Sequence, residues 1–109
     1  MILKHNVPLY QEIYAALQNA ILSGRLAPGQ RLPPLRQLAS LFLANPNTIQ
    51  RAAQELQRDG FLNAYSRKGY FVTSDLDLIA RCRKAREKEL LQTFHRQMND
   101  LGHSPAELP

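Results

Sequence analysis

The side chains best able to make specific hydrogen bonds gather between residues 45 and 58, where apolar residues recur with helical spacing. Asn47 and Gln50 carry carboxamides that can pair with the N6 and N7 edge of adenine, and Arg51 can pair with guanine or with phosphate. Thr48 can bind a phosphate or contact a thymine methyl group. These residue types favour contact with duplex DNA, although an ordinary amphipathic surface helix has the same spacing.

A second group of cations lies at Arg67 and Lys68, beside Gly69. The apolar stretches 61–65 and 70–73 on either side predict a β-hairpin, with these residues at its tip. Cations at such a tip can meet phosphates or enter a minor groove, and the glycine allows the backbone to approach closely. A charged turn that simply stays in water is the alternative interpretation.

Apolar periodicity predicts the helices that position these groups, over 8–24, 35–43 and 46–60, and residues 30–32 could form a short strand. The start of the third helix is the sharpest boundary, because Asn45 can accept from backbone N–H groups and the proline after it suits the first helical position. Two short helices separated by a tight turn are the arrangement that lets the second helix enter a major groove. The expected fold is mainly α with a small β-hairpin.

The net charge of +5 is unevenly distributed along the chain. Residues 1–74 hold eight basic and three acidic residues, whereas residues 75–109 hold six of each. A basic surface on the first segment suggests a polyanionic partner, and a balanced second segment suggests a helix that is solvated or self-associating. We therefore expect a DNA-binding domain over 1–74 and a C-terminal helical dimerisation segment over 75–109.

The second segment has helical spacing and more apolar residues than a lone exposed helix should carry. Its stripe is too broken for a long two-stranded coiled coil, so a shorter partner surface is expected. The candidate dimerisation residues are Leu78, Ile79, Cys82, Leu90, Leu91, Phe94 and Met98. Gly102 is expected to end this helix. Residues 104–107 have the pattern of another helix start, so we expect that the C-terminal end is truncated.

Several classes of function are disfavoured by what the sequence lacks. No apolar run approaches the roughly 18 residues that a membrane span needs, so the chain is expected to be soluble and cytoplasmic. Cys82 is the single cysteine, and His5, His95 and His103 are scattered, so no metal site and no cofactor are expected. No nucleophile and base, phosphate loop or paired carboxylates can be assembled, which argues against an enzyme.

The chain resembles the GntR regulators in several stretches: Pro8-Leu9-Tyr10, Leu32-Pro33, Leu35-Arg36-Gln37-Leu38-Ala39, Asn45-Pro46-Asn47-Thr48 and Gly69-Tyr70-Phe71-Val72. The Asn-Pro-Asn-Thr turn and the short helical tail are most similar to the YtrA branch. The resemblance implies a winged helix-turn-helix and a homodimer that binds an inverted-repeat operator, usually as a repressor. Carried over by position, it implies DNA contacts at Arg36, Asn45, Asn47, Thr48, Gln50, Arg51, Arg67, Lys68 and Gly69.

Three residues depart from the family pattern. Pro34 stands where the family usually has a serine that caps the second helix, so a hydroxyl is lost there. Leu43 replaces the usual glycine of the turn, which is unexpected if that position needs a positive φ. Arg67 replaces an expected glycine of the wing, so we expect the tip to be less tightly turned and more cationic.

Some alternatives stay open at this level. Arg36 would face the DNA backbone in this arrangement, or it would form a surface salt bridge with Glu12 or Glu55. A protein-interaction module could use the same fold without touching DNA, and salt-sensitive binding to duplex DNA would separate the two classes. The approximately 35 residues after the wing cannot hold the cofactor domain of aminotransferase-fused regulators. The sequence indicates no ligand pocket, so it does not decide whether a small-molecule effector binds.

Overall fold

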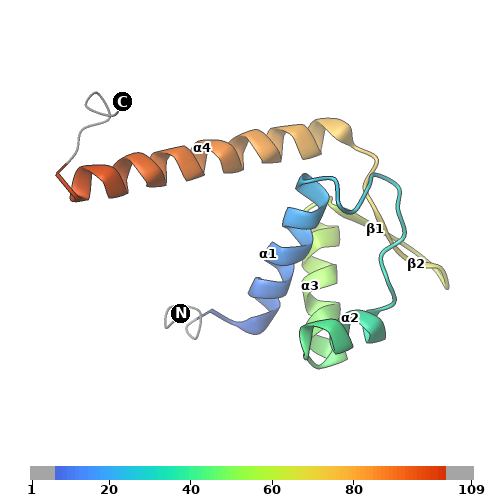
Figure 1. The fold of residues 1–109 in the computed structure, drawn as a ribbon. Coiled ribbons are helices and arrows are strands. Elements are labelled where there is room, and N and C mark those ends of the chain that lie inside the picture. Colours follow the sequence, from blue (N-terminus) through green and yellow to red (C-terminus); the bar gives the residue numbers. More distant parts are fainter. Residues whose placement is uncertain (1–6, 103–109) are drawn as a thin grey trace. The chain divides into compact units, whose positions relative to one another are not determined.

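The computed structural model describes residues 7–102 and is mainly helical with one hairpin, as predicted (Figure 1). Its elements are α1 (Leu9–Leu22), α2 (Leu35–Phe42), α3 (Pro46–Arg58), β1 (Leu62–Tyr65), β2 (Gly69–Val72) and α4 (Leu76–Asp100). The chain divides into two compact units, the first ending at Ile79 and the second beginning at Ala80.

The core of the first unit lies where α3 packs against both α1 and α2 (Figure 1). Ala52 and Ala53 are fully buried at the centre of α3, and their small side chains allow the neighbouring helices to approach closely. Larger buried side chains from α3 and from the segments around it complete the core: Ile13, Leu17, Ile21, Leu38, Ile49, Leu56, Phe61, Leu62 and Val72. The apolar positions predicted for α3 are therefore the ones that hold it in place.

The start of α3 is capped as the sequence predicts. The side-chain oxygen of Asn45 accepts a hydrogen bond of 2.8 Å from the backbone N–H of Asn47. Pro46 occupies the first turn, where its missing N–H has no partner in any helix. This cap fixes the direction in which α3 leaves the turn after α2.

The turn between α2 and α3 requires a positive φ, which the chain provides without glycine. Leu43 has φ of 52° and ψ of 46°, in the left-handed region, and its side chain is 91% exposed. The backbone N–H of Ala44 donates to the carbonyl of Ala39 at 2.9 Å and closes the end of α2. At the other end of α2, Pro34 makes no side-chain capping bond, as expected from the missing serine hydroxyl.

The hairpin is a two-stranded antiparallel sheet in which Leu62 pairs with Val72 and Tyr65 with Gly69. The expectation of a less tightly turned tip is wrong. Arg67 adopts φ of 63°, and the backbone N–H of Lys68 donates to the carbonyl of Tyr65 at 2.9 Å. Arginine thus takes the left-handed conformation itself, so the tip is tight and cationic.

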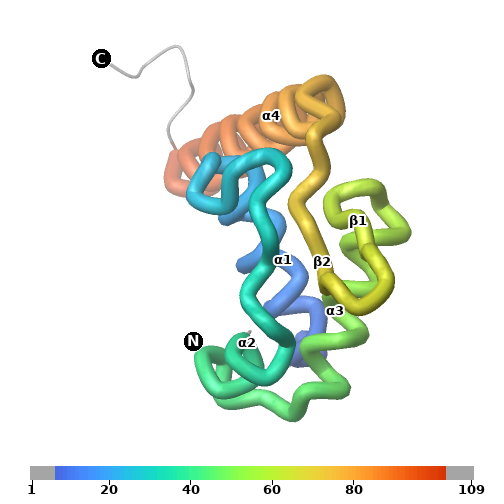
Figure 2. The backbone as a smooth tube through the Cα atoms, turned by 90° about the vertical axis from the view of Figure 1, so that its right-hand side faces the viewer, coloured from blue at the N-terminus to red at the C-terminus, as the bar shows by residue number. Residues whose placement is uncertain are grey.

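The predicted strand over 30–32 is reduced to a single bridge, between Arg31 and Phe71. The connection between α1 and α2 runs beside β2 in this region (Figure 2). The backbone N–H of Val72 donates to Gln30 at 2.8 Å, and that of Leu32 donates to Tyr70 at 2.8 Å. The pairing stops there because the two prolines after Leu32 have no N–H to donate. This segment ties the connection between α1 and α2 to the hairpin.

Asp75 directly precedes helix α4, and its carboxylate accepts a hydrogen bond of 3.1 Å from the backbone N–H of Leu78. The first residues of α4 belong to the first unit, where Ile79 is only 4% exposed, and the rest forms the second unit. Gly102, with φ of 89°, follows the helix as predicted. The helix start expected at residues 104–107 lies outside the described residues. Among residues 7–102, no helix is both long and apolar enough to cross a membrane.

Candidate nucleic-acid interface

The face of α3 opposite the core presents polar side chains to solvent. Successive residues turn by about 100° around a helix, so Asn47, Arg51 and Gln54 fall on the side opposite the buried Ile49. All three are exposed, and Gln50 is exposed on one flank of this face. Gln54 is not among the contacts predicted from the family pattern, although its spacing from Gln50 places it on the same surface.

Two of the predicted contact residues have partly structural roles. The carboxamide oxygen of Asn45 is used in the helix cap, so its amide nitrogen is the group that can donate to a ligand. Thr48 is half-buried, whereas Asn47 beside it is exposed. At the start of α3, the Asn45 carboxamide therefore serves the helix cap, whereas the Asn47 carboxamide is exposed to solvent.

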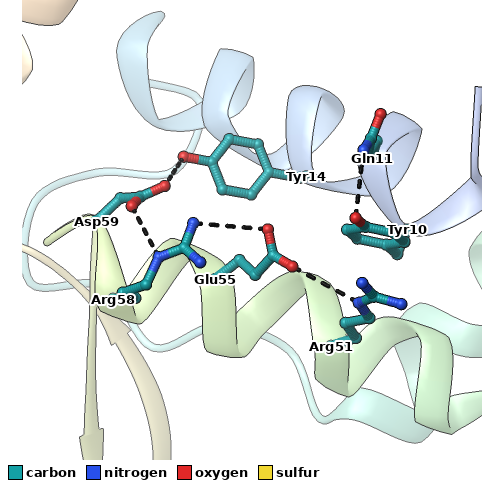
Figure 3. A network of polar contacts seen from close by, with 7 residues as sticks. All are labelled: Tyr10, Gln11, Tyr14, Arg51, Glu55, Arg58 and Asp59. Carbon is teal, nitrogen blue, oxygen red and sulfur yellow. Dashed lines mark hydrogen bonds and ion pairs between the residues drawn. The ribbon is translucent and has the colours of Figure 1, made fainter.

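A chain of polar contacts runs along α3 and across to α1 (Figure 3). Glu55 pairs with Arg58 at 3.7 Å, and the Nε of Arg58 donates to Asp59 at 3.2 Å. The hydroxyl of Tyr14, on α1, donates to the other oxygen of Asp59 at 2.5 Å. This hydrogen bond, and secondarily Arg58, hold the pKa of the Asp59 carboxyl below its ordinary value. The same carboxylate raises the pKa of Arg58 through the hydrogen bond and charge that it supplies.

Arg51 lies at the exposed end of this chain and is held by two partners. Its Nε is 3.6 Å from a carboxylate oxygen of Glu55, one helical turn further along α3. Its guanidinium carbon is 3.7 Å from the centre of the Tyr10 ring, which belongs to the first turn of α1 (Figure 3). The guanidinium therefore has a defined position on the outer face before any ligand is present.

The hairpin tip carries Arg67, Lys68 and Gly69 together, all of them exposed. A β-carbon placed on Gly69 would lie 3.6 Å from the Nε of Arg31, so the Arg31 side chain reaches the base of the tip. Arg31 thus adds a third cation to this region, and no local sequence signal predicts it. Its position follows from the long-range bridge to β2.

The hairpin is stiffened by an aromatic contact close to the tip. The rings of Tyr65 and Phe71, on opposite strands, meet edge to face with centroids 5.3 Å apart. Such diagonal pairs on one face of a hairpin stabilise the register of its strands.

Arg36, the second residue of α2, is exposed. Neither of the alternative salt bridges is formed among residues 7–102, because Glu55 pairs with Arg51 and Arg58, and no ion pair joins Arg36 to Glu12. Arg36 therefore keeps its charge at the surface of α2.

The remaining apolar candidates all lie on α4, and most of them belong to the second unit. Leu90, Leu91 and Phe94 are 62%, 59% and 48% exposed, respectively. Cys82 and Met98 are half-buried, while Leu78 and Ile79 belong to the first unit. Leu101 is 75% exposed and extends the same surface, although it is not among the predicted residues. Residues 91, 94, 98 and 101 follow the spacing of one helix face.

No group of three His, Cys, Asp or Glu side chains gathers within the described part of the chain in a way that could hold a metal ion. The chemistry that the exposed side chains of the first unit can perform is hydrogen bonding from carboxamides on α3 and charge neutralisation by arginine and lysine.

Comparison with known proteins relates this geometry to a family. The model of "Bacterial regulatory proteins, gntR family" matches residues 9–72, from the start of α1 to the end of β2. The chain is 32% identical over 72 residues to the HTH-type transcriptional repressor YtrA of Bacillus subtilis, covering 66% of this chain and 55% of YtrA. It is 30% identical over 101 residues to the uncharacterized HTH-type transcriptional regulator YhcF of the same organism, covering 93% and 84%. The chain thus spans about half the length of YtrA and most of YhcF. These relatives are transcriptional regulators and not enzymes.

Solved structures agree with this similarity. A GntR family transcriptional regulator from Listeria monocytogenes superposes with a TM-score of 0.85 at 28% identity, covering 94% of this chain and 90% of that one. The AraR(DBD), solved in complex with operator ORR3, superposes with a TM-score of 0.60 at 27% identity, covering 62% and 81%. The winged helix-turn-helix and the resemblance to YtrA predicted from the sequence are therefore confirmed. The chain belongs to the GntR family of bacterial regulatory proteins.

Proposed function

We propose that this protein is a cytoplasmic bacterial transcription regulator that binds an inverted-repeat operator as a homodimer and represses transcription by occupying the promoter. The observation that carries the proposal is the outer face of α3, where exposed carboxamides and a guanidinium stand beside one another. YtrA, a relative, is named a repressor, and AraR, a structural neighbour, was solved on operator DNA. Both facts support the proposal by analogy.

In this proposal α3 enters the major groove and reads base edges. Asn47, Gln50 and Gln54 present carboxamides of the kind that pair with adenine, and Arg51 presents the group that pairs with guanine. The carboxamide oxygen of Asn45 caps α3, and its amide nitrogen can donate to a phosphate. Thr48 would contribute through its hydroxyl at the edge of the same surface.

The hairpin would hold the flanking sugar-phosphate backbone. Arg67, Lys68 and Arg31 concentrate positive charge at or beside its tip, and Gly69 lets the backbone approach closely. Arg36 on α2 would make a further phosphate contact. Contacts of this kind fix the register of a protein on DNA without reading its sequence.

The exposed apolar face of the second unit would bind a second copy of the chain. Leu90, Leu91 and Phe94 expose about half of their surface or more, and Met98 and Leu101 continue the face by helical spacing. A surface of this kind on an otherwise charged helix is typical of an interface. A symmetric dimer would place its two α3 helices on two half-sites of the operator, about one turn of the DNA helix apart.

In vitro selection from random duplex DNA with the purified chain tests the proposal. Enrichment of an inverted repeat is the expected result, because two equivalent recognition helices read two equivalent half-sites. A folded protein that enriches no sequence would favour the alternative of a protein-interaction module. Repeating the selection in the presence of cell extract metabolites tests whether an effector is required.

Sedimentation velocity tests the homodimer. Leu91→Glu places a charge on the apolar face and should shift the protein toward monomer. Gln92→Glu adds the same charge at the next position, which is polar and exposed, and serves as the matched control. Equal sedimentation of both variants and the wild type as dimers would exclude this face as the interface.

A further inference from the structure

The contact between Tyr10 and Arg51 joins the first turn of α1 to the outer face of α3. The distance of 3.7 Å from the guanidinium carbon to the ring centre lies well within the range of cation–π contacts. Glu55 holds the Nε of the same guanidinium from the side, at 3.6 Å (Figure 3). The arginine is therefore fixed by one contact across two helices and one contact along its own helix.

These two contacts leave the terminal nitrogens of Arg51 available for a ligand. Arg51 meets the Glu55 carboxylate through its Nε, and the Tyr10 ring occupies one face of the guanidinium. The terminal nitrogens are the donors used in bidentate contacts with guanine or phosphate. A long arginine side chain otherwise loses considerable conformational entropy when it binds, so holding it in advance favours binding.

The position of Arg51 makes this ordering relevant to recognition. It lies one turn after Asn47 and three residues before Gln54, so it is at the centre of the exposed polar face of α3. Tyr10 is half-buried, and the hydroxyl of its ring accepts a hydrogen bond of 3.2 Å from Gln11 rather than from α3. The ring itself is thus the part of Tyr10 that acts on Arg51.

We propose that Tyr10 is a positioning residue that sets the direction in which the Arg51 guanidinium meets DNA, so that α1 influences the base preference of α3. The inference rests on the proposed function, because it assigns a specificity role within the same interface. Removing the Tyr10 ring should therefore reduce discrimination at the same base pair as removing the Arg51 side chain, although Tyr10 itself contacts no base.

A double-mutant cycle on the full chain tests the proposal. Fluorescence anisotropy measures binding to the duplex obtained by selection and to versions of it changed at single base pairs. The proteins compared are the wild type, Tyr10→Leu, Arg51→Ala and the double variant. We expect Tyr10→Leu to weaken binding by about three- to tenfold and to reduce discrimination at the base pair affected by Arg51→Ala. In the Arg51→Ala background, Tyr10→Leu should have no further effect. Tyr10→Phe keeps the ring and should restore the binding that Tyr10→Leu loses.

Two outcomes of the cycle would overturn the inference. If Tyr10→Leu weakens binding equally with and without Arg51, Tyr10 only supports the fold. If Tyr10→Phe is as damaging as Tyr10→Leu, the hydroxyl and not the ring is responsible.

A measurement on the wild type remains decisive if Tyr10→Leu fails to fold. Protons of the Arg51 side chain above an aromatic ring should have NMR resonances shifted upfield by the ring current. Resonances at ordinary positions would remove the contact and with it the proposal. If the wild type selects no DNA, the proposed function fails while the NMR result still reports on the contact. If the wild type binds but the cycle is additive, only the role of Tyr10 fails.

Discussion

Replacing Leu43 with glycine should stabilise the protein, because the turn between α2 and α3 places a leucine in a conformation that glycine adopts freely. Leu43 has φ of 52°, and a left-handed conformation costs a non-glycine residue about 1–2 kcal/mol. Its side chain is 91% exposed, so removing it costs only about 0.2 kcal/mol of buried apolar surface. Glycine also increases the conformational freedom of the unfolded chain, which lowers the free energy of unfolding by about 0.5–1 kcal/mol and offsets part of the gain from relieved strain. The net expectation is a gain of about 0.5 kcal/mol in the free energy of unfolding.

Urea unfolding followed by circular dichroism, at one fixed protein concentration, measures this difference. Leu43→Ala is the matched control, because it removes the same side chain but keeps a β-carbon in the left-handed conformation. We expect Leu43→Ala to stay close to the wild type and Leu43→Gly to exceed it. If the two variants unfold at the same urea concentration, the strain attributed to this turn does not exist.

Three further predictions concern the cap, the polar chain and the hairpin. Asn45→Ala should lower the free energy of unfolding by about 1 kcal/mol, while Asn45→Asp keeps an acceptor and should recover most of it in urea titrations. The lowered pKa of Asp59, caused first by the hydrogen bond from Tyr14, means that its carboxylate stabilises the fold above the unfolded pKa of about 3.9. That contribution disappears as the pH falls through the lower folded pKa, so Asp59→Asn should flatten the pH dependence of unfolding below pH about 4. Gly69→Ala should lower the free energy of unfolding by about 1–2 kcal/mol, because alanine must adopt φ of 97° beside the Arg31 side chain, and should shift the thermal midpoint downward. A Gly69→Ala protein as stable as the wild type would contradict the geometry of the hairpin.

Local chemistry is what the sequence predicts well in this chain. The start of α3 follows from Asn45 and Pro46, since a capping side chain and a first-turn proline act within a few residues of each other. The apolar stripe of α3 likewise predicts its buried face. The turn at Leu43 shows the limit of such rules, because a leucine adopts the conformation expected only of glycine when the surrounding helices impose it.

Contacts between distant segments are what the sequence does not predict. Arg31 reaches the hairpin only because backbone hydrogen bonds join its segment to β2. Tyr10 reaches Arg51 only because α1 packs against α3. The segment 30–32 forms only a single bridge, at Arg31, flanked by backbone hydrogen bonds of Gln30 and Leu32, and the two prolines that follow keep this pairing from extending further.

In the proposed function, α3 reads bases while the hairpin tip holds phosphates. Titration of the selected duplex and its single-base-pair variants, at several salt concentrations, tests it with Asn47→Ala and Lys68→Ala. Asn47→Ala should lose discrimination at one base pair in each half-site, at a cost of about 1–3 kcal/mol, with an unchanged salt dependence. Lys68→Ala should weaken binding to all duplexes alike and reduce the slope of log affinity against log salt by about 1.8, because each of the two hairpins of the dimer loses one phosphate contact worth about 0.9. Unchanged base preference in Asn47→Ala together with an unchanged salt slope in Lys68→Ala would contradict the account.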